Sequence, residues 1–249
     1  MNAGAPPNGA CALEFRDVSY RVGGNLILDK LSFRVEPGRT LVLLGRSGSG
    51  KTTALKMLNG LLFPTEGQVL VDGRATTDCN LIELRRSIGY VIQDVGLFPH
   101  FTIGENVGLV PRLNGWPSRR VSTRVAELLH QVGLDPAQFH HRFPRQLSGG
   151  QRQRVGVARA LAAEPKVLLF DEPFGALDPV TRVELQDQFL ELRDRLQKTS
   201  IFVTHDVREA LRLGTEIALL HRGKLEVLTT PAQFLDSKGP EARAFLSTL

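Results

Sequence analysis

The sequence has few of the residues that stabilise secreted or membrane-spanning proteins. Among its 249 residues there are only two cysteines, Cys11 and Cys79, which do not indicate a disulfide framework and suit a reducing cytosol. The apolar runs are short, such as those at 41–44, 167–170 and 217–220. A helix that spans a bilayer needs about 20 apolar residues. The sequence therefore predicts neither a disulfide-stapled domain nor a membrane span.

The N-terminus lacks the features of an export signal. Met1 to Ala12 contain no positively charged residue and no apolar core. Cys11 follows Asn-Gly-Ala instead of an apolar segment, which argues against a lipid-modified cysteine. We therefore expect no secretory signal here.

Basic residues only slightly outnumber acidic residues in this sequence. Lys and Arg number 31 against 26 Asp and Glu, which gives a net charge of +5 and suits an anionic partner such as nucleotide, nucleic acid or a lipid surface. The arginines are spread along the chain, and the densest groups (85–86, 119–120 and 152–159) are expected on solvated helix faces. The charge pattern by itself does not predict binding of nucleic acid.

One glycine-rich stretch carries the strongest functional signal. Residues 45–53 fit the phosphate-binding pattern G-x4-G-K-[ST], between an apolar strand (40–44) and the start of a helix (53–58). Glycines let the backbone approach phosphate oxygens, and the helix start directs N–H groups and a dipole toward them. We expect the Lys51 ammonium to reach the β- and γ-phosphates and the Thr52 hydroxyl to bind Mg²⁺. The expected phosphate contacts are Gly45, Arg46, Ser47, Gly48, Ser49, Gly50, Lys51, Thr52 and Thr53.

The remaining chain alternates strands and helices. An antiparallel region is expected before and after the loop, and a helical insertion from about 95 to 162. Thr102 and Glu105 have capping-box spacing, and apolar residues at helical spacing follow at 121–132. Strands at 167–170 and 200–204 alternate with helices, which predicts a largely parallel sheet. The tail, 217–249, predicts two short strands and two short helices in what we interpret as one domain over 1–249.

An acidic pair closes one of the buried strands. Asp171 and Glu172 follow an apolar strand, at the end where ligands bind in open α/β sheets. Asp171 is the expected Mg²⁺ ligand, and Glu172 could polarise a water for attack on the γ-phosphate. Taken alone, the pair could equally be a solvated strand end. The phosphate loop favours the catalytic interpretation.

Seven motifs in one order resemble those of ATP-binding cassette (ABC) proteins, over essentially the whole chain. Leu147 to Gln151 (LSGGQ) is similar to the ABC signature motif. The resemblance makes residues 45–53 the Walker A loop and 167–172 Walker B, and it implies an α/β P-loop NTPase (RecA-like) with an N-terminal antiparallel β subdomain and an α-helical insertion subdomain. The other matches are Tyr20 (adenine platform), Gln93 (Q-loop, metal), Ala176 to Asp178 (D-loop) and His205 (switch).

The resemblance also implies a dimeric mechanism that uses ATP and Mg²⁺. In the family, two cassettes pair head to tail, and Ser148, Gly149, Gly150 and Gln151 of one cap the ATP held by the other. Asp178 would communicate across that dimer, and His205 would contact the γ-phosphate. Without the resemblance, Asp178 predicts a helix N-cap, Gln151 an exposed helix residue and Tyr20 a half-buried strand aromatic.

A single cassette with no heptad run and two unrelated cysteines favours a transport role within the family, and the Q-loop region narrows the class of solute. Residues 88–111 are similar to the quaternary-amine (glycine betaine, carnitine, choline) uptake cassettes. This implies a homodimer, membrane permease subunits, indirectly a substrate-binding protein, and a peripheral place on the cytoplasmic face of the cell membrane. Many members of that subfamily extend beyond the cassette into paired regulatory modules that sense ionic strength; the sequence to Leu249 does not itself indicate this regulation. Importers of phosphonate, polyamine or amino acid remain alternatives, as does an ABC ATPase acting on nucleic acid, although no nucleic-acid partner is expected.

Overall fold

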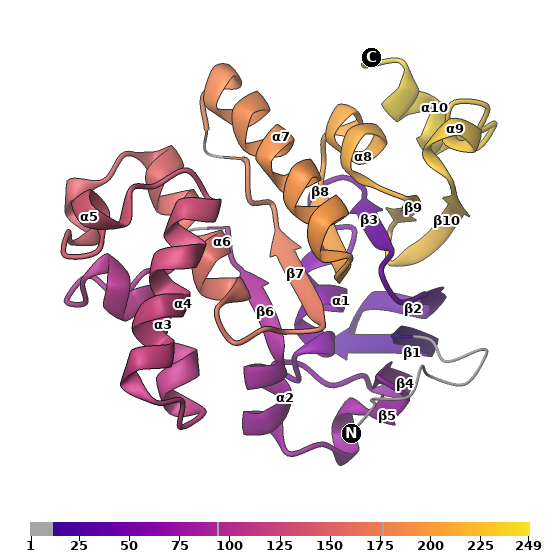
Figure 1. The fold of residues 1–249 in the computed structure, drawn as a ribbon. Helices are drawn as coiled ribbons and strands as arrows, with labels where there is room; N and C mark the ends of the chain where they lie inside the picture. The colour runs from indigo at the N-terminus through magenta and orange to yellow at the C-terminus, as the bar shows by residue number, and fades with distance from the viewer. Residues whose placement is uncertain (1–11, 94, 176) are drawn as a thin grey trace. The chain divides into compact units, whose positions relative to one another are not determined.

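The structure, a computed structural model, describes residues 12–93, 95–175 and 177–249. Cys11 lies outside these residues, and so does Ala176, the first residue of the expected D-loop. The chain divides into two compact units (Figure 1). Unit 1 combines residues 1–84 with 199–249, and unit 2 is formed by 85–198. We describe each unit by itself. The predicted single domain over 1–249, with its insertion at 95–162, stays a prediction.

An antiparallel sheet forms the first half of unit 1. Its strand order is β2-β1-β4-β5, with register pairs that include Leu13 with Val35 and Leu13 with Val71. Phe15 and Phe33 lie opposite each other in this register and stack with ring centroids 4.4 Å apart. The expectation of an antiparallel region is confirmed. Its strands are β1 (Leu13–Val22), β2 (Asn25–Val35), β4 (Glu66–Val71) and β5 (Arg74–Ala75).

A second sheet in unit 1 carries the phosphate loop. Parallel strands β8 and β9 flank β3, and β10 pairs antiparallel with β9. All five residues of β3 are buried, as a strand covered on both faces requires. The strands are β3 (Thr40–Leu44), β8 (Thr199–Thr204), β9 (Glu216–His221) and β10 (Lys224–Thr229). The helices of unit 1 are α1 (Lys51–Leu58), η1 (Thr76–Asp78), α8 (Val207–Leu213), α9 (Pro231–Phe234) and α10 (Pro240–Leu246).

Unit 2 joins a parallel strand pair to a group of helices. Strands β6 and β7 pair from Ile88 with Val167 to Val91 with Phe170. Helix α6 packs so closely on β6 that a Cβ at Gly89 would collide with the Ala160 carbonyl oxygen. The elements are β6 (Ile88–Val91), α3 (Ile103–Leu113), α4 (Ser118–Gln131), α5 (Pro136–Phe139), η2 (Pro144–Gln146), α6 (Gly149–Leu161), β7 (Val167–Asp171) and α7 (Pro179–Leu196). Helix α2 (Leu81–Ser87) contains the boundary between the units.

The local signals in the sequence were accurate where a cap or a buried run defined an element. The capping box of Thr102 and Glu105 begins α3, and the two strands and two helices of the tail are present as predicted. Helix α1 begins at Lys51, two residues before the predicted start, because the phosphate loop feeds directly into its first turn. Within the described residues, no helix is long and apolar enough to cross a bilayer.

Candidate nucleotide-binding site

The predicted phosphate loop lies between β3 and α1. Gly50 is the N-cap of α1, with φ 99° and ψ 1°, and no side chain caps this helix. A residue with a Cβ is strained in that left-handed conformation. A Cβ at Gly50 would also lie 2.6 Å from Leu28 Cδ2 and 3.1 Å from the Ile27 carbonyl oxygen. Glycine is therefore required here both by conformation and by space.

Lys51 is held by the loop that precedes it. Its Nζ donates to the carbonyl oxygens of Gly45 (2.7 Å) and Arg46 (3.0 Å), and the residue is only 5% exposed. Burial of an ammonium group requires such partners. The loop thus closes around the cation and fixes it at the start of α1, where the helix dipole already favours an anion.

The loop also holds a buried hydroxyl. Ser49 Oγ is inaccessible to solvent and has no hydrogen-bond partner among the described residues. A Cβ at Gly45 would lie 2.6 Å from that oxygen, so only glycine leaves this space open. A buried polar atom of this kind is costly unless a ligand satisfies it. This observation fits a phosphate-binding cradle.

Of the other two predicted residues of unit 1, Tyr20 lies on β1 and His205 directly follows β8. Leu44 and Thr204 are register partners in the parallel pair β3–β8, so Gly45 and His205 both leave the sheet at the same edge. His205 is exposed, at the turn into α8 that Asp206 caps by accepting from the Arg208 N–H (2.8 Å). Tyr20 is half-buried on β1. The structure thus places His205 beside the loop at the strand ends; it does not test the adenine role of Tyr20.

In unit 2, register brings the Q-loop glutamine and the acidic pair to one edge. Val91 pairs with Phe170, so Asp171, the last residue of β7, and Gln93, two residues after β6, lie at the ends of neighbouring parallel strands. Asp171 is buried, and the Tyr90 hydroxyl donates to its Oδ2 at 3.4 Å. Burial, and then the Asp171 charge, raise the pKa of the Tyr90 phenol well above its usual value, so it remains a donor at neutral pH. Glu172 has φ +44°, a left-handed conformation that a non-glycine residue rarely adopts.

The chain that follows Gln93 is tied to the signature helix. Arg159, on α6, donates to the carbonyl oxygens of Val95 (2.5 Å) and Gly96 (2.6 Å). Val95 itself has φ +54°, which is strained for a β-branched residue. Burial lowers the pKa of the Arg159 guanidinium, which nevertheless stays charged at neutral pH. Arg159 therefore holds a strained segment of the Q-loop against α6.

The signature residues form the N-terminus of α6. Ser148 Oγ accepts from the Gln151 N–H (3.2 Å), and Gln151 Oε1 accepts from the Ser148 N–H (3.0 Å). Ser148 and Gly149 are exposed, whereas a Cβ at Gly150 would lie 2.6 Å from Thr181 Cγ2. Gln151 is thus part of a capping box and not simply an exposed helix glutamine. Gly150 is required by close packing.

Asp178 is the N-cap of α7. Its side chain accepts from the Thr181 N–H at 3.0 Å, and this backbone hydrogen bond is the main reason why the pKa of the carboxyl is lowered. The local interpretation, an N-cap before Pro179, is confirmed. Communication by Asp178 across a dimer stays a prediction.

The donor atoms of the predicted metal ligands fit a hard cation such as Mg²⁺. The described residues contain no group of three His, Cys, Asp or Glu side chains that could hold a metal by themselves. Mg²⁺ needs no such cage, because it takes one or two protein oxygens and completes its shell with phosphate oxygens and water. Thr52 in unit 1 and Asp171 and Gln93 in unit 2 offer only oxygen ligands of this type.

Some residues around the site were not predicted from the sequence. Tyr90 and Arg159 contact predicted site residues or their neighbours, and so does Glu241, which binds Arg46. For Tyr90 the available signal was its place three residues before Gln93 on a short strand. Arg159 and Glu241 carry no local signal, because their partners are 64 and 195 residues away.

A glycine-rich loop between a buried parallel strand and a helix, with a buried lysine at the helix start, defines a P-loop nucleotide-binding fold. Residues 28–175 match the family model described as "ABC transporter". The chain belongs to the ABC transporter family.

Relatives and solved structures agree with this assignment. The chain is 50% identical over 208 residues to the osmoprotectant import ATP-binding protein OsmV of Salmonella typhimurium, covering 84% of this chain and 54% of that protein. It is 45% identical over 227 residues to the glycine betaine uptake system ATP-binding protein YehX of Escherichia coli (88% and 73%). A dimeric structure of the ATP-binding cassette MJ0796 bound to ADP and Pi superimposes with a TM-score of 0.79 at 33% identity (88% and 98%). The chain spans about half the length of several curated relatives.

Proposed function

We propose that the chain is the ATP-hydrolysing subunit of an ABC importer, peripheral on the cytoplasmic face of the membrane, and that its solute is a quaternary-amine osmoprotectant. The observation that carries the proposal is the buried Lys51 at the uncapped start of α1, with the unsatisfied Ser49 hydroxyl beside it. The solute class is supported by relatives named for osmoprotectant import and glycine betaine uptake. Phosphonate, polyamine or amino acid is the alternative solute.

Each site residue has a role in this proposal. Lys51 and the loop N–H groups bind the phosphates of ATP, with Tyr20 against the adenine. Thr52, Gln93 and Asp171 are the residues that would hold Mg²⁺, and the chemistry that such an ion would supply is neutralisation of the charge on the phosphates. Glu172 takes a proton from the attacking water, and the His205 imidazole orients that water or the γ-phosphate.

We further propose that two copies pair head to tail. The exposed N-terminus of α6 (Ser148, Gly149) is then the surface that meets the nucleotide of the second copy, and permease subunits dock on the assembly. The dimeric MJ0796 structures, at 33–34% identity, support the pairing of two copies. ATP binding would shift the population toward the closed pair, and hydrolysis would release it.

A substitution of Glu172 separates binding from hydrolysis. We expect E172Q to bind ATP as tightly as the wild-type chain but to hydrolyse it roughly 10²–10⁴-fold more slowly, because a general base contributes about that factor. The trapped ATP should also shift the variant to a dimer. Calorimetry, a phosphate-release assay and light scattering measure the three quantities. An E172Q chain that stays monomeric in saturating ATP would contradict the paired mechanism.

The transport role is tested with the same variant. Tagged E172Q is incubated with detergent-solubilised membranes of its own host in the presence of ATP, with K51A as the control that should not trap a complex. Recovery of a multi-span permease with E172Q, and not with K51A, would support the importer. Uptake of labelled glycine betaine, choline or carnitine by cells with and without the gene then identifies the solute. Recovery of nucleic acid or ribosomal proteins without a membrane protein would favour the alternative ABC ATPase.

A further inference from the structure

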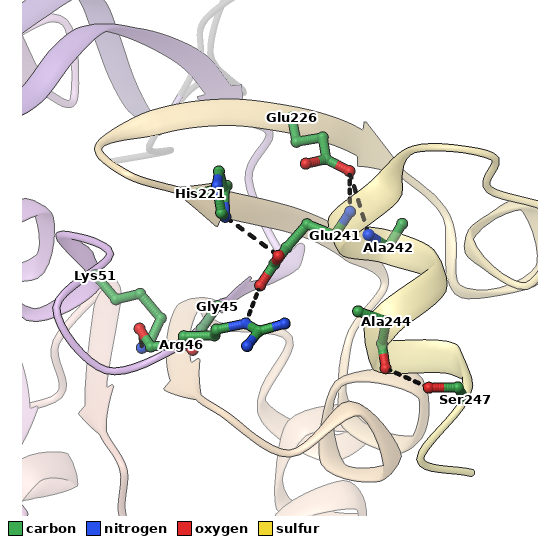
Figure 2. A network of polar contacts seen from close by, with 9 residues as sticks. All are labelled: Gly45, Arg46, Lys51, His221, Glu226, Glu241, Ala242, Ala244 and Ser247. Carbon is green, nitrogen blue, oxygen red and sulfur yellow. Dashed lines mark hydrogen bonds and ion pairs between the residues drawn. The ribbon is translucent and has the colours of Figure 1, made fainter.

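The phosphate loop is tied to the last helix of the chain. Arg46, the second residue of the loop, donates from Nε to Glu241 Oε1 at 2.5 Å, and the other oxygen of Glu241 lies 3.3 Å from His221 Nδ1 (Figure 2). Glu241 is in the first turn of α10, and His221 ends β9. The contact therefore joins three segments of unit 1 that are remote in sequence.

Glu241 is held firmly in place. It is only 7% exposed, and its own N–H and that of Ala242 both donate to Glu226 Oε1 at 3.2 Å (Figure 2). A Cβ at Gly239 would collide with the same Glu226 oxygen, so the chain enters α10 in close contact with β10. A carboxylate buried to this degree needs a cationic partner such as Arg46, because an unpaired charge there is strongly unfavourable.

Arg46, the partner of Glu241, also helps to hold Lys51. The Arg46 side chain binds Glu241 while its carbonyl oxygen accepts from Lys51 Nζ at 3.0 Å. The turn between β9 and β10 adds a second constraint, since the Gly223 N–H donates to the Ser49 carbonyl oxygen at 3.2 Å. The loop is thus held from outside by the C-terminal segment and from inside by the lysine.

We propose that Glu241 is a positioning residue of the phosphate loop: through Arg46 it keeps the loop in the conformation that binds nucleotide, so that docking of α10 sets the affinity for ATP. The inference rests on the proposed nucleotide site. Holding the loop before the ligand arrives lowers the ordering cost that binding would otherwise include. Glu241 touches no reacting group, so the maximal rate of hydrolysis should not depend on it.

The chain offers a matched control for a purely stabilising ion pair. Glu14 is a buried carboxylate with two cationic partners, and Arg34 Nε donates to it at 2.7 Å. The Arg34 and Arg46 side chains are similarly exposed, at 69% and 66%. Both pairs lie in unit 1, but Glu14 and Arg34 belong to the antiparallel sheet and not to the loop. R34M should therefore reproduce any general loss of stability without changing the loop.

The experiment measures ATP affinity by calorimetry, well below the unfolding temperature, for wild-type, R46M, E241Q, the double variant and R34M. We expect E241Q to raise Kd and KM about three- to tenfold with kcat unchanged, and R46M to raise Kd by a similar factor, the range for one coupled contact. The double variant should bind no more weakly than R46M, and R34M should bind as wild type. Thermal unfolding of R46M and R34M confirms that both are folded.

Three results would overturn the inference. If R46M weakens binding and E241Q does not, Arg46 acts directly on the nucleotide. If R46M, E241Q and R34M all bind as wild type, the contact serves stability alone. If wild-type protein itself fails to bind ATP, the proposed nucleotide site is wrong and the inference falls with it. The last result is distinguished from the others by the wild-type measurement.

Discussion

Two helices of this protein begin at predicted anion-binding motifs, and they begin differently. Helix α1 starts after Gly50, in a left-handed conformation with no side-chain cap, and its first residue, Lys51, is buried. Helix α6 starts after Ser148, in extended conformation with a complete capping box, and Gly149 in its first turn is exposed. One helix start is enclosed by its own loop; the other is capped and turned to solvent.

The difference shows how a helix N-terminus is prepared for a ligand. A helix start needs partners for its first N–H groups. At α1 no side chain caps the helix, and in the proposed site phosphate oxygens take that position. At α6, Ser148 and Gln151 already satisfy part of that requirement, so the helix is stable without a ligand. We therefore expect α1 to bind nucleotide within one chain and α6 to contribute only when a second copy provides it.

The substitution with the largest expected effect on this comparison removes the Lys51 side chain. We expect K51A to weaken ATP binding by about 10²-fold, because charged hydrogen bonds to the phosphates are lost. The loop should also lose its internal contacts to Gly45 and Arg46. Calorimetric titration with ATP measures the effect. An unchanged Kd would mean that the enclosed helix start is not the nucleotide site.

The second test strains the start of α1. We expect G50A to lower both stability and ATP affinity, by roughly 1–2 kcal/mol in unfolding free energy from the left-handed conformation alone. Gly48 has a similar φ of +79°, but a Cβ there would meet no atom within 4 Å, so G48A carries the strain without the clash. Denaturant unfolding should rank G50A below G48A. Equal stability would show that Leu28 moves aside without cost.

The third test removes the cap of α6. We expect S148A to cost about 1 kcal/mol of unfolding free energy, the usual effect of losing an N-cap hydroxyl. Its ATP affinity as a monomer should fall far less than that of K51A, whereas ATP-driven pairing in an E172Q background should weaken. Light scattering and denaturant unfolding separate the two effects. Pairing as strong as that of E172Q alone would exclude Ser148 from the interface.

The smallest effect concerns Asp178, which caps α7. Hydrogen bonds, chiefly from the Thr181 N–H, lower the pKa of its carboxyl in the folded state below the unfolded value of about 3.9. Its stabilising contribution is therefore complete above the unfolded pKa and is lost as pH falls through the folded pKa. The difference in Tm between wild-type and D178A should shrink in acid. A difference that does not depend on pH would mean that ionisation is irrelevant to the cap.

Much of this fold could be predicted because its signals are local. Buried strands such as 40–44 are continuous apolar runs, and the caps at Thr102 and Asp178 depend on residues at most three positions away. The positions of the catalytic candidates were equally predictable, since Asp171 ends a buried strand and Glu172 directly follows it. What the sequence pattern missed are contacts between remote residues, such as Arg159 with Val95 and Glu241 with Arg46.

The sequence by itself determined the family, the order of motifs and the approximate places of the capped helices and buried strands, because each depends on neighbouring residues and on the periods of helix and strand. Tertiary structure alone decided which carbonyl oxygens hold Lys51, that Gly45 and His205 leave one sheet edge, and that α10 reaches the loop. Those facts follow from strand order and close packing. Such contacts join residues far apart along the chain, so no local pattern can specify them.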